Sequence, residues 1–238
     1  MSSTFVLGGE LEVRRLGFGA MRIVDDAEEG KRVLRRALEL GVNLIDTADI
    51  YGTGRSEELI AEALHPYPDG LVIGTKGGLG YGFQQRERDA RPERLRQACD
   101  GSLRRLRLER IDLYQLHRHD PEVPIEESVG ALEELRREGK IRLIGLSNVS
   151  VGQLRAAQSV TRIVSVQNQY NRGLLTSQEM LDACEAEQIA FFPWEPLGEG
   201  LGEPAAELRW LLERSPVMLP IPGTSRVEHL EANMRAVR

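Results

Sequence analysis

The sequence has almost no cysteine. Only Cys99 and Cys184 occur among 238 residues, and both lie inside helical patterns. Two cysteines in such positions exclude a disulfide framework as the source of stability. The pair is typical of a protein from a reducing compartment.

An excess of positive charge is also missing. The chain carries 31 Lys and Arg against 37 Asp and Glu, a formal net charge of −6. Because nucleic acids and anionic membranes are bound through clustered positive charge, this balance argues against both as partners. No apolar run approaches the ~20 residues of a membrane span, and the N-terminal residues lack a charged region followed by an apolar one. We expect a soluble, cytoplasmic, monomeric protein that acts on a small molecule.

A strand-linked GxGxxG fingerprint for dinucleotide phosphates is absent as well. Gly17, Gly19, Gly77, Gly78 and Gly80 are scattered turn glycines, which argues against an open doubly wound sheet. Apolar strand patterns instead alternate with helical patterns eight times, at about 30 residues per unit. The chain is 41% hydrophobic and can bury the core of one large domain. We predict an α/β fold, a (β/α)8 TIM barrel with an N-terminal β-hairpin, formed by residues 1–238 as a single domain.

The expected elements follow from apolar periodicity and from turn residues. The strands cover 16–20, 43–49, 71–77, 111–116, 141–146, 163–168, 190–194 and 217–221. The helices cover 26–40, 56–64, 92–106, 125–138, 151–158, 176–187 and 205–213, and a last one begins near the end. Two short strands around Gly8-Gly9 predict a hairpin that plugs the barrel floor. Ser150–Gln153 and Thr176–Glu179 both match a helix capping box.

Four titratable side chains follow three successive strands. Asp46 and Tyr51 belong to one strand end, Lys76 to the next and His117 to the third. Because the C-terminal ends of barrel strands form one rim, we expect these groups to meet there. The Lys76 ammonium would lower the pKa of Tyr51, Asp46 would hold Lys76 charged, and His117 would orient a substrate oxygen. Such a phenol suits protonation of a carbonyl oxygen as hydride reaches its carbon, which implies a nicotinamide cofactor.

Other interpretations of these residues stay open. Asp46 and Tyr51 are also compatible with a buried loop cap and a packing ring. Lys76 is also compatible with a Schiff-base nucleophile in a barrel lyase or aldolase. His117 and His119 form an HxH pair, but only two further histidines occur in the chain. We therefore predict no metal site.

Six short blocks together resemble the aldo-keto reductase family. In the family's order they are NLIDTADIYG at 43–52, TKGG at 75–78, LYQLHR at 113–118, GLSN at 145–148, VQNQYN at 166–171 and PIPGTSR at 220–226. The resemblance spans nearly the whole chain and is greatest to bacterial-type members. It implies NADPH-dependent reduction of aldehydes and ketones, with Tyr51 as general acid, Asp46 and Lys76 as its tuning pair, and His117 as the substrate-orienting residue.

The same resemblance implies a set of NADP(H) contacts. The matching residues are Ala20, Met21, Ser147, Asn148, Gln167, Trp194, Gly223, Thr224, Ser225, Arg226 and Asn233. Ser147, Asn148 and Gln167 would hydrogen-bond the nicotinamide carboxamide. Trp194 would stack on the nicotinamide ring, where the family usually places a tyrosine. Asn233 would contact the adenine.

The segment 223–226 would receive the 2′-phosphate side of the cofactor. Thr224, Ser225 and the backbone N–H groups of the helix start that follows favour an anion site, and Arg226 adds a positive charge. Ser147 and Asn148 are equally compatible with capping the helix that follows them.

Some parts of the family pattern are short here. The connections at 22–27 and 197–208 are brief, and the chain ends at Arg238, where members usually carry a longer tail. Since these parts normally form a cofactor belt and the walls of the substrate pocket, we expect a shallow site. The alternative interpretation is an NADP(H)-binding barrel with little turnover that acts as a regulatory or redox-sensing partner.

Overall fold

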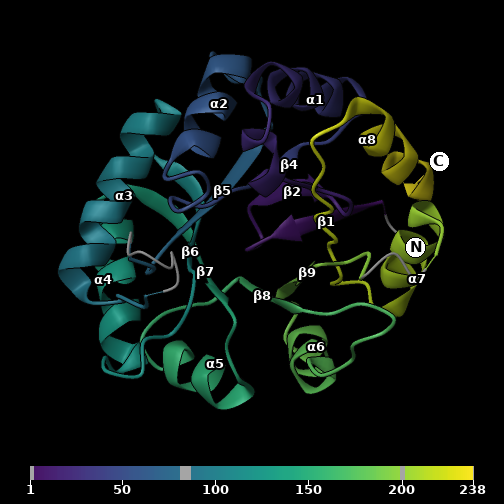
Figure 1. Ribbon diagram of the computed structural model, residues 1–238. Helices are drawn as coiled ribbons and strands as arrows, with labels where there is room; N and C mark the ends of the chain where they lie inside the picture. The colour runs from purple at the N-terminus through teal and green to yellow at the C-terminus, as the bar shows by residue number, and fades with distance from the viewer. Residues whose placement is uncertain (1–2, 81–86, 199–201, 238) are drawn as a thin grey trace.

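The computed structural model describes residues 3–80, 87–198 and 202–237, and its core is one curled parallel sheet. Seven strands pair in chain order, so that each βα unit places its strand beside the previous one (Figure 1). They are β3 (Phe18–Gly19), β4 (Leu44–Asp46), β5 (Val72–Gly77), β6 (Ile111–Leu116), β7 (Ile141–Ser147), β8 (Ser165–Gln169) and β9 (Ala190–Trp194).

Helices form a ring outside the sheet, as Figure 1 shows. They are α1 (Ala27–Glu39), α2 (Arg55–Leu64), α3 (Pro92–Leu106), α4 (Ile125–Arg137), α5 (Val151–Gln158), α6 (Gln178–Ala186), α7 (Pro204–Arg214) and α8 (Val227–Met234), with short 3₁₀ turns η1 (Met21–Val24) and η2 (Arg235–Val237). In α1, for example, Val33, Leu34 and Ala37 share the buried face. The predicted barrel architecture is confirmed.

The segment 217–223 closes the ring between β9 and β3. The N–H groups of Gly17 and Gly19 donate to the carbonyls of Pro220 and Pro222, at 3.0 and 3.2 Å. On its other side the segment exchanges two hydrogen bonds of 2.8 Å with the β9 backbone. These contacts amount to two isolated bridges, and the prediction of a regular eighth strand is wrong. The reason is that the two prolines have no N–H to donate, so a continuous ladder cannot form.

The predicted N-terminal hairpin is confirmed, and it seals one end of the barrel. β1 (Thr4–Leu7) and β2 (Leu11–Arg14) pair antiparallel across Gly8 and Gly9, whose φ angles of 62° and 75° suit a tight hairpin turn. Leu7 and Val13 are fully buried. They belong to one cluster with the side chains that fill the barrel, namely Leu44, Val72, Leu113, Leu143, Val164, Ala190, Phe192, Leu219 and Ile221. The hairpin covers one end of the barrel, so a functional site is expected at the other end, where the C-terminal ends of the strands lie.

Only one of the two predicted capping boxes exists. At the start of α5, Ser150 Oγ accepts from the Gln153 N–H at 3.2 Å, and Gln153 Oε1 accepts from the Ser150 N–H at 2.9 Å. The box predicted at Thr176–Glu179 is wrong, because α6 begins at Gln178 and its N-cap residue, Ser177, makes no side-chain capping hydrogen bond. Gln178 instead accepts from the Tyr170 hydroxyl at 2.5 Å, which ties the helix start to the segment after β8.

The two cysteines are buried free thiols, Cys99 in α3 and Cys184 in α6. Within the described ranges, no helix is long and apolar enough to cross a membrane. The connection at 197–208 and the chain end at Arg238 include residues outside those ranges. The expectation of a shallow pocket therefore stays a prediction.

Candidate active site

Asp46, Tyr51, Lys76 and His117 are brought together at the C-terminal rim. β4 ends at Asp46, β5 carries Lys76, and His117 follows β6. Lys76 Nζ lies 2.6 Å from Asp46 Oδ2 and 5.3 Å from the centroid of the Tyr51 ring. The Tyr51 and His117 rings meet nearly edge-on, with centroids 5.9 Å apart. The spacing along three strands thus produces one compact cluster.

Lys76 is fully buried and stays an ammonium. Its Nζ donates to the Asp46 carboxylate and, at 2.7 Å, to the Thr47 carbonyl. Burial alone lowers the pKa of Lys76, but the charge of Asp46 and the hydrogen bonds to Asp46 and Tyr51 raise it more. The net pKa of Lys76 is raised. A Schiff-base nucleophile must be neutral, so this geometry argues against the lyase interpretation.

Two glutamines hold the Asp46 carboxylate from the other side. Asp46 Oδ1 accepts from Gln115 Nε2 at 3.1 Å and from Gln167 Nε2 at 3.0 Å. Gln115 was not among the predicted site residues. The sequence feature that could have identified Gln115 is that it is the one amide in the largely apolar strand before His117. Asp46 thus uses one of the two N–H donors of the Gln167 amide.

The pKa of Tyr51 is shifted in the direction opposite to the prediction. Burial raises the pKa of its hydroxyl, and this effect outweighs the lowering by the charge and hydrogen bond of Lys76. The pKa is therefore raised above the ordinary value of 10. As a result, the phenol carries its proton throughout the neutral range.

His117 is a neutral imidazole. Burial, followed by the charges of Lys76 and Arg118, holds the pKa of His117 well below its usual value. Its Nδ1 is buried and has no hydrogen-bond partner among the residues that the structure describes. A neutral ring offers one N–H donor and one acceptor to a ligand.

Asp49 is a further buried carboxylate that the spacing argument missed. It is fully buried on the loop to Tyr51, its N–H donates to the Lys76 carbonyl at 3.1 Å, and it lies 3.9 Å from Arg94 of α3. Burial and then the charge of Glu57 raise the pKa of Asp49 to about 7, although Arg94 and Arg105 lower it. The sequence feature that could have identified Asp49 is its position three residues after Asp46, within the block NLIDTADIYG.

A chain of polar groups crosses the rim beside this cluster. Trp194 Nε1 donates to Asn148 Oδ1 at 3.0 Å, and Asn148 Nδ2 donates to Ser147 Oγ at 2.9 Å. Ser147 Oγ then donates to the Gln167 carbonyl at 3.0 Å. Amide and hydroxyl groups of this kind match the donors and acceptors of a primary carboxamide. The four residues predicted near the nicotinamide thus lie together in one hydrogen-bonded chain.

The other predicted cofactor residues lie apart from this chain. Ala20 is buried and joins β3 to β4, because its N–H donates to the Asp46 carbonyl at 2.8 Å. Met21 is exposed, whereas Asn233 of α8 is buried. Gly223 forms the bridge to Gly19 that completes the barrel, where an added Cβ would lie 2.8 Å from the Gly19 carbonyl oxygen.

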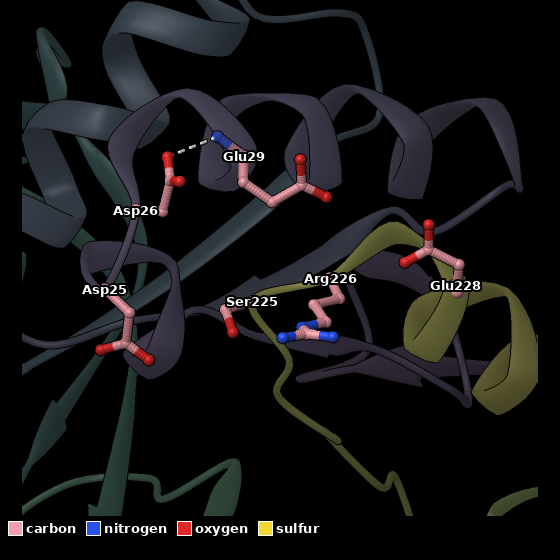
Figure 2. A pocket seen from close by; sticks show the side chains of 6 residues that line it. All are labelled: Asp25, Asp26, Glu29, Ser225, Arg226 and Glu228. Carbon is pink, nitrogen blue, oxygen red and sulfur yellow. Dashed lines mark hydrogen bonds between the residues drawn. The ribbon is translucent and has the colours of Figure 1, made fainter.

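Ser225 and Arg226 line a separate pocket of about 370 Å³. Its other walls come from Asp25, Asp26 and Glu29 near the start of α1 and from Glu228 of α8 (Figure 2). Among the described residues, no group of three His, Cys, Asp or Glu side chains is placed to hold a metal ion.

Several known proteins are similar to this chain in sequence and in fold. The model of the aldo/keto reductase family matches residues 15–207. Pyridoxine 4-dehydrogenase of Escherichia coli is 40% identical over 266 positions, covering 99% of this chain and 93% of the relative. Since 266 positions exceed the 238 residues here, the relative carries inserted segments that this chain lacks.

Two solved structures superpose closely. Glycerol dehydrogenase of Gluconobacter oxydans has a TM-score of 0.92 and 27% identity, covering 99% of this chain and 90% of its own. An aldo/keto reductase of Klebsiella pneumoniae, solved with NADP and acetate, has a TM-score of 0.83 and 25% identity over 99% of this chain and 90% of its own. With the family match and the rim cluster, these likenesses show that the chain is an oxidoreductase of the aldo/keto reductase family.

Proposed function

We propose that the protein is an NADPH-dependent reductase of aldehydes and ketones in which Tyr51 is the general acid. The observation that carries this proposal is the contact of a charged, buried Lys76 with a protonated Tyr51 beside a neutral His117. We further propose that residues 1–238 act as one barrel domain and as a monomer.

The proposed cofactor site uses the polar chain across the rim. Ser147, Asn148 and the amide oxygen of Gln167 would hold the carboxamide, and Trp194 would cover the nicotinamide ring. When bound, the cofactor supplies a hydride to the carbonyl carbon. The complex of the Klebsiella relative with NADP supports this assignment.

The residues of this chain would provide orientation and a proton. The neutral His117 would donate its N–H to the substrate oxygen and direct it toward the Tyr51 hydroxyl. Tyr51 would give its proton to that oxygen as negative charge develops there. The Lys76 ammonium would stabilise the resulting tyrosinate, and Asp46, 2.6 Å from Lys76, would keep the ammonium charged.

The substrate class is a small carbonyl compound or the alcohol that corresponds to it. Two relatives are named for dehydrogenation of an alcohol, pyridoxine in one case and glycerol in the other. Hydride transfer between alcohol and carbonyl is reversible chemistry, so the same site serves either direction.

The test is NADPH consumption with a panel of small aldehydes, compared between the wild type and Tyr51→Phe. We expect turnover in the wild type and a loss of about 10²- to 10⁴-fold in kcat in the variant, the usual size of a general-acid contribution. NADPH binding, followed by fluorescence titration, should change little, because the hydroxyl serves the proton transfer.

Binding without turnover in the wild type would contradict this proposal. That result would favour the regulatory interpretation. Unchanged kcat in Tyr51→Phe would remove Tyr51 as the acid, even if the protein is a reductase.

A further inference from the structure

The pocket around Arg226 is dominated by negative charge. Four carboxylates, from Asp25, Asp26, Glu29 and Glu228, line it together with the single guanidinium of Arg226. Figure 2 shows Asp25, Asp26 and Glu29 on one wall, and Ser225 and Arg226 on the segment that leads into α8. No ion pair ties Arg226 to a partner in the described part of the chain, so its charge is available to a ligand.

Glu29 already occupies the helix start that an anion would use. The first N–H of α8, from Val227, donates to Glu29 Oε1 at 3.3 Å. The preceding N–H, from Arg226, donates to Thr224 Oγ1 at 3.1 Å. Glu29 Oε2 is held 2.5 Å from Arg32, and the side chain is only 21% exposed. Two of the backbone donors predicted for an anion, the N–H groups of Arg226 and Val227, therefore have partners within the chain.

The ligand that this pocket would meet is the ribose end of the proposed cofactor. By the family resemblance, the proposed cofactor would direct its 2′-phosphate toward residues 223–226, and a phosphate monoester bears nearly two negative charges at neutral pH. It would have to displace the Glu29 carboxylate and then lie among three others. A free 2′-hydroxyl meets no such repulsion and can donate a hydrogen bond to a carboxylate, the usual way acidic residues select NAD.

We propose that Glu29 is a specificity-determining residue that lowers the preference of this site for NADPH over NADH. This inference rests on the proposed cofactor site. The Glu29 carboxylate acts as an internal competitor for the 2′-phosphate at the start of α8. Asp25 contributes the same effect more weakly, because it is exposed, and within the described residues no hydrogen bond joins its side chain to the helix start.

The test measures the Kd of NADPH and of NADH separately, by quenching of tryptophan fluorescence at low salt. In Glu29→Gln the Kd of NADPH should fall about five- to tenfold, the effect of one charge at a partly buried helix end. The Kd of NADH should change less than about twofold. The gain should shrink at high salt, since screening weakens charge repulsion.

Glu28→Gln is the matched control. Glu28 lies in the same helical turn, pairs with Lys31, and is 80% exposed outside the pocket. The same change of net charge there should leave both affinities within about twofold. Asp25→Asn, an exposed change that puts no buried contact at risk, should move the NADPH affinity in the same direction as Glu29→Gln.

Equal changes for NADPH and NADH in Glu29→Gln would overturn the inference while leaving the reductase proposal intact. The same holds if Glu28→Gln reproduces the gain. If a folded wild type binds neither cofactor, the proposed function and this inference both fail.

Discussion

Burial decides the protonation of the polar side chains at the barrel rim. Burial raises the pKa of Tyr51 and lowers the pKa of His117, so that both rings are neutral near pH 7. Lys76 is buried more deeply than either ring, and it remains charged chiefly because Asp46 stands 2.6 Å away. Asp46 in turn is held by two amides and the ammonium. One cation and two neutral proton carriers thus lie side by side.

Asp49 should make the stability of the fold depend on pH. Its pKa is about 7 in the folded protein against 3.8 ordinarily, so the folded state binds more protons between these values. The free energy of unfolding should therefore fall as pH rises from about 4 to about 7, by at most about 1.4 kcal/mol per pH unit from this group. Asp49→Asn removes the titration, and urea unfolding should show its stability gain over the wild type growing across that range. A pH-independent difference would contradict the assignment.

At this scale the sequence predicts which residues meet, but not how they titrate. The positions of Asp46, Tyr51, Lys76 and His117 follow from strand ends in a barrel, which spacing reveals. The raised pKa of Tyr51 depends on burial by distant segments, and the contact of Gln115 with Asp46 depends on side-chain direction within the barrel. Neither this pKa nor this contact can be predicted from the spacing of residues along the chain.

Helix starts show that a local motif is decided by its tertiary neighbours. Ser150–Gln153 forms the reciprocal capping box that its sequence predicts. Thr176–Glu179 fits the same pattern, yet Gln178 is bound by Tyr170 and by Arg214, and the helix begins inside the motif, at Gln178, with Ser177 as its N-cap. A capping motif fixes a helix start only where no stronger contact moves it.

Alanine substitution at the two motifs should give different results. Ser150→Ala removes a hydrogen bond to a backbone N–H and should cost about 1 kcal/mol of unfolding free energy. Thr176→Ala removes no capping bond and should stay within about 0.5 kcal/mol of the wild type. Chemical denaturation of both variants under one condition checks this. A cost of about 1 kcal/mol in Thr176→Ala would mean that the second box does form.

At the scale of the whole molecule, the barrel is closed differently between β9 and β3 than between its other neighbouring strands. The segment 217–223 makes this closure. Seven strands and their pairing order could be predicted from repeated strand and helix patterns, because each unit is about 30 residues long. The eighth position could not be predicted as it is, because residues 217–221 have a strand-like apolar pattern while Pro220 and Pro222 interrupt the ladder. Close backbone approach at Gly19 and Gly223 completes the ring instead.

Any side chain added at Gly19, where the barrel closes, should destabilise the fold. A Cβ there would lie 2.7 Å from the Ile221 carbonyl oxygen, a backbone atom that cannot move without opening the barrel. Gly19→Ala should therefore lower the unfolding free energy by roughly 1–3 kcal/mol. Gly130→Ala in α4, where nothing lies within 4 Å of the added Cβ, should be neutral or stabilising by up to about 1 kcal/mol. Equal thermal stability of the two variants would refute this account of the closure.

The most direct measurement of the central claim is the fate of the cofactor hydride. Reduction of a small aldehyde with NADPH deuterated at C4 of the nicotinamide should place deuterium on the former carbonyl carbon of the product alcohol. Tyr51→Phe should form this product at least about 10²-fold more slowly while binding NADPH as before. Saturating NADPH binding without any deuterated alcohol, over a broad panel of aldehydes and ketones, would contradict the assignment of this rim as a reductase site.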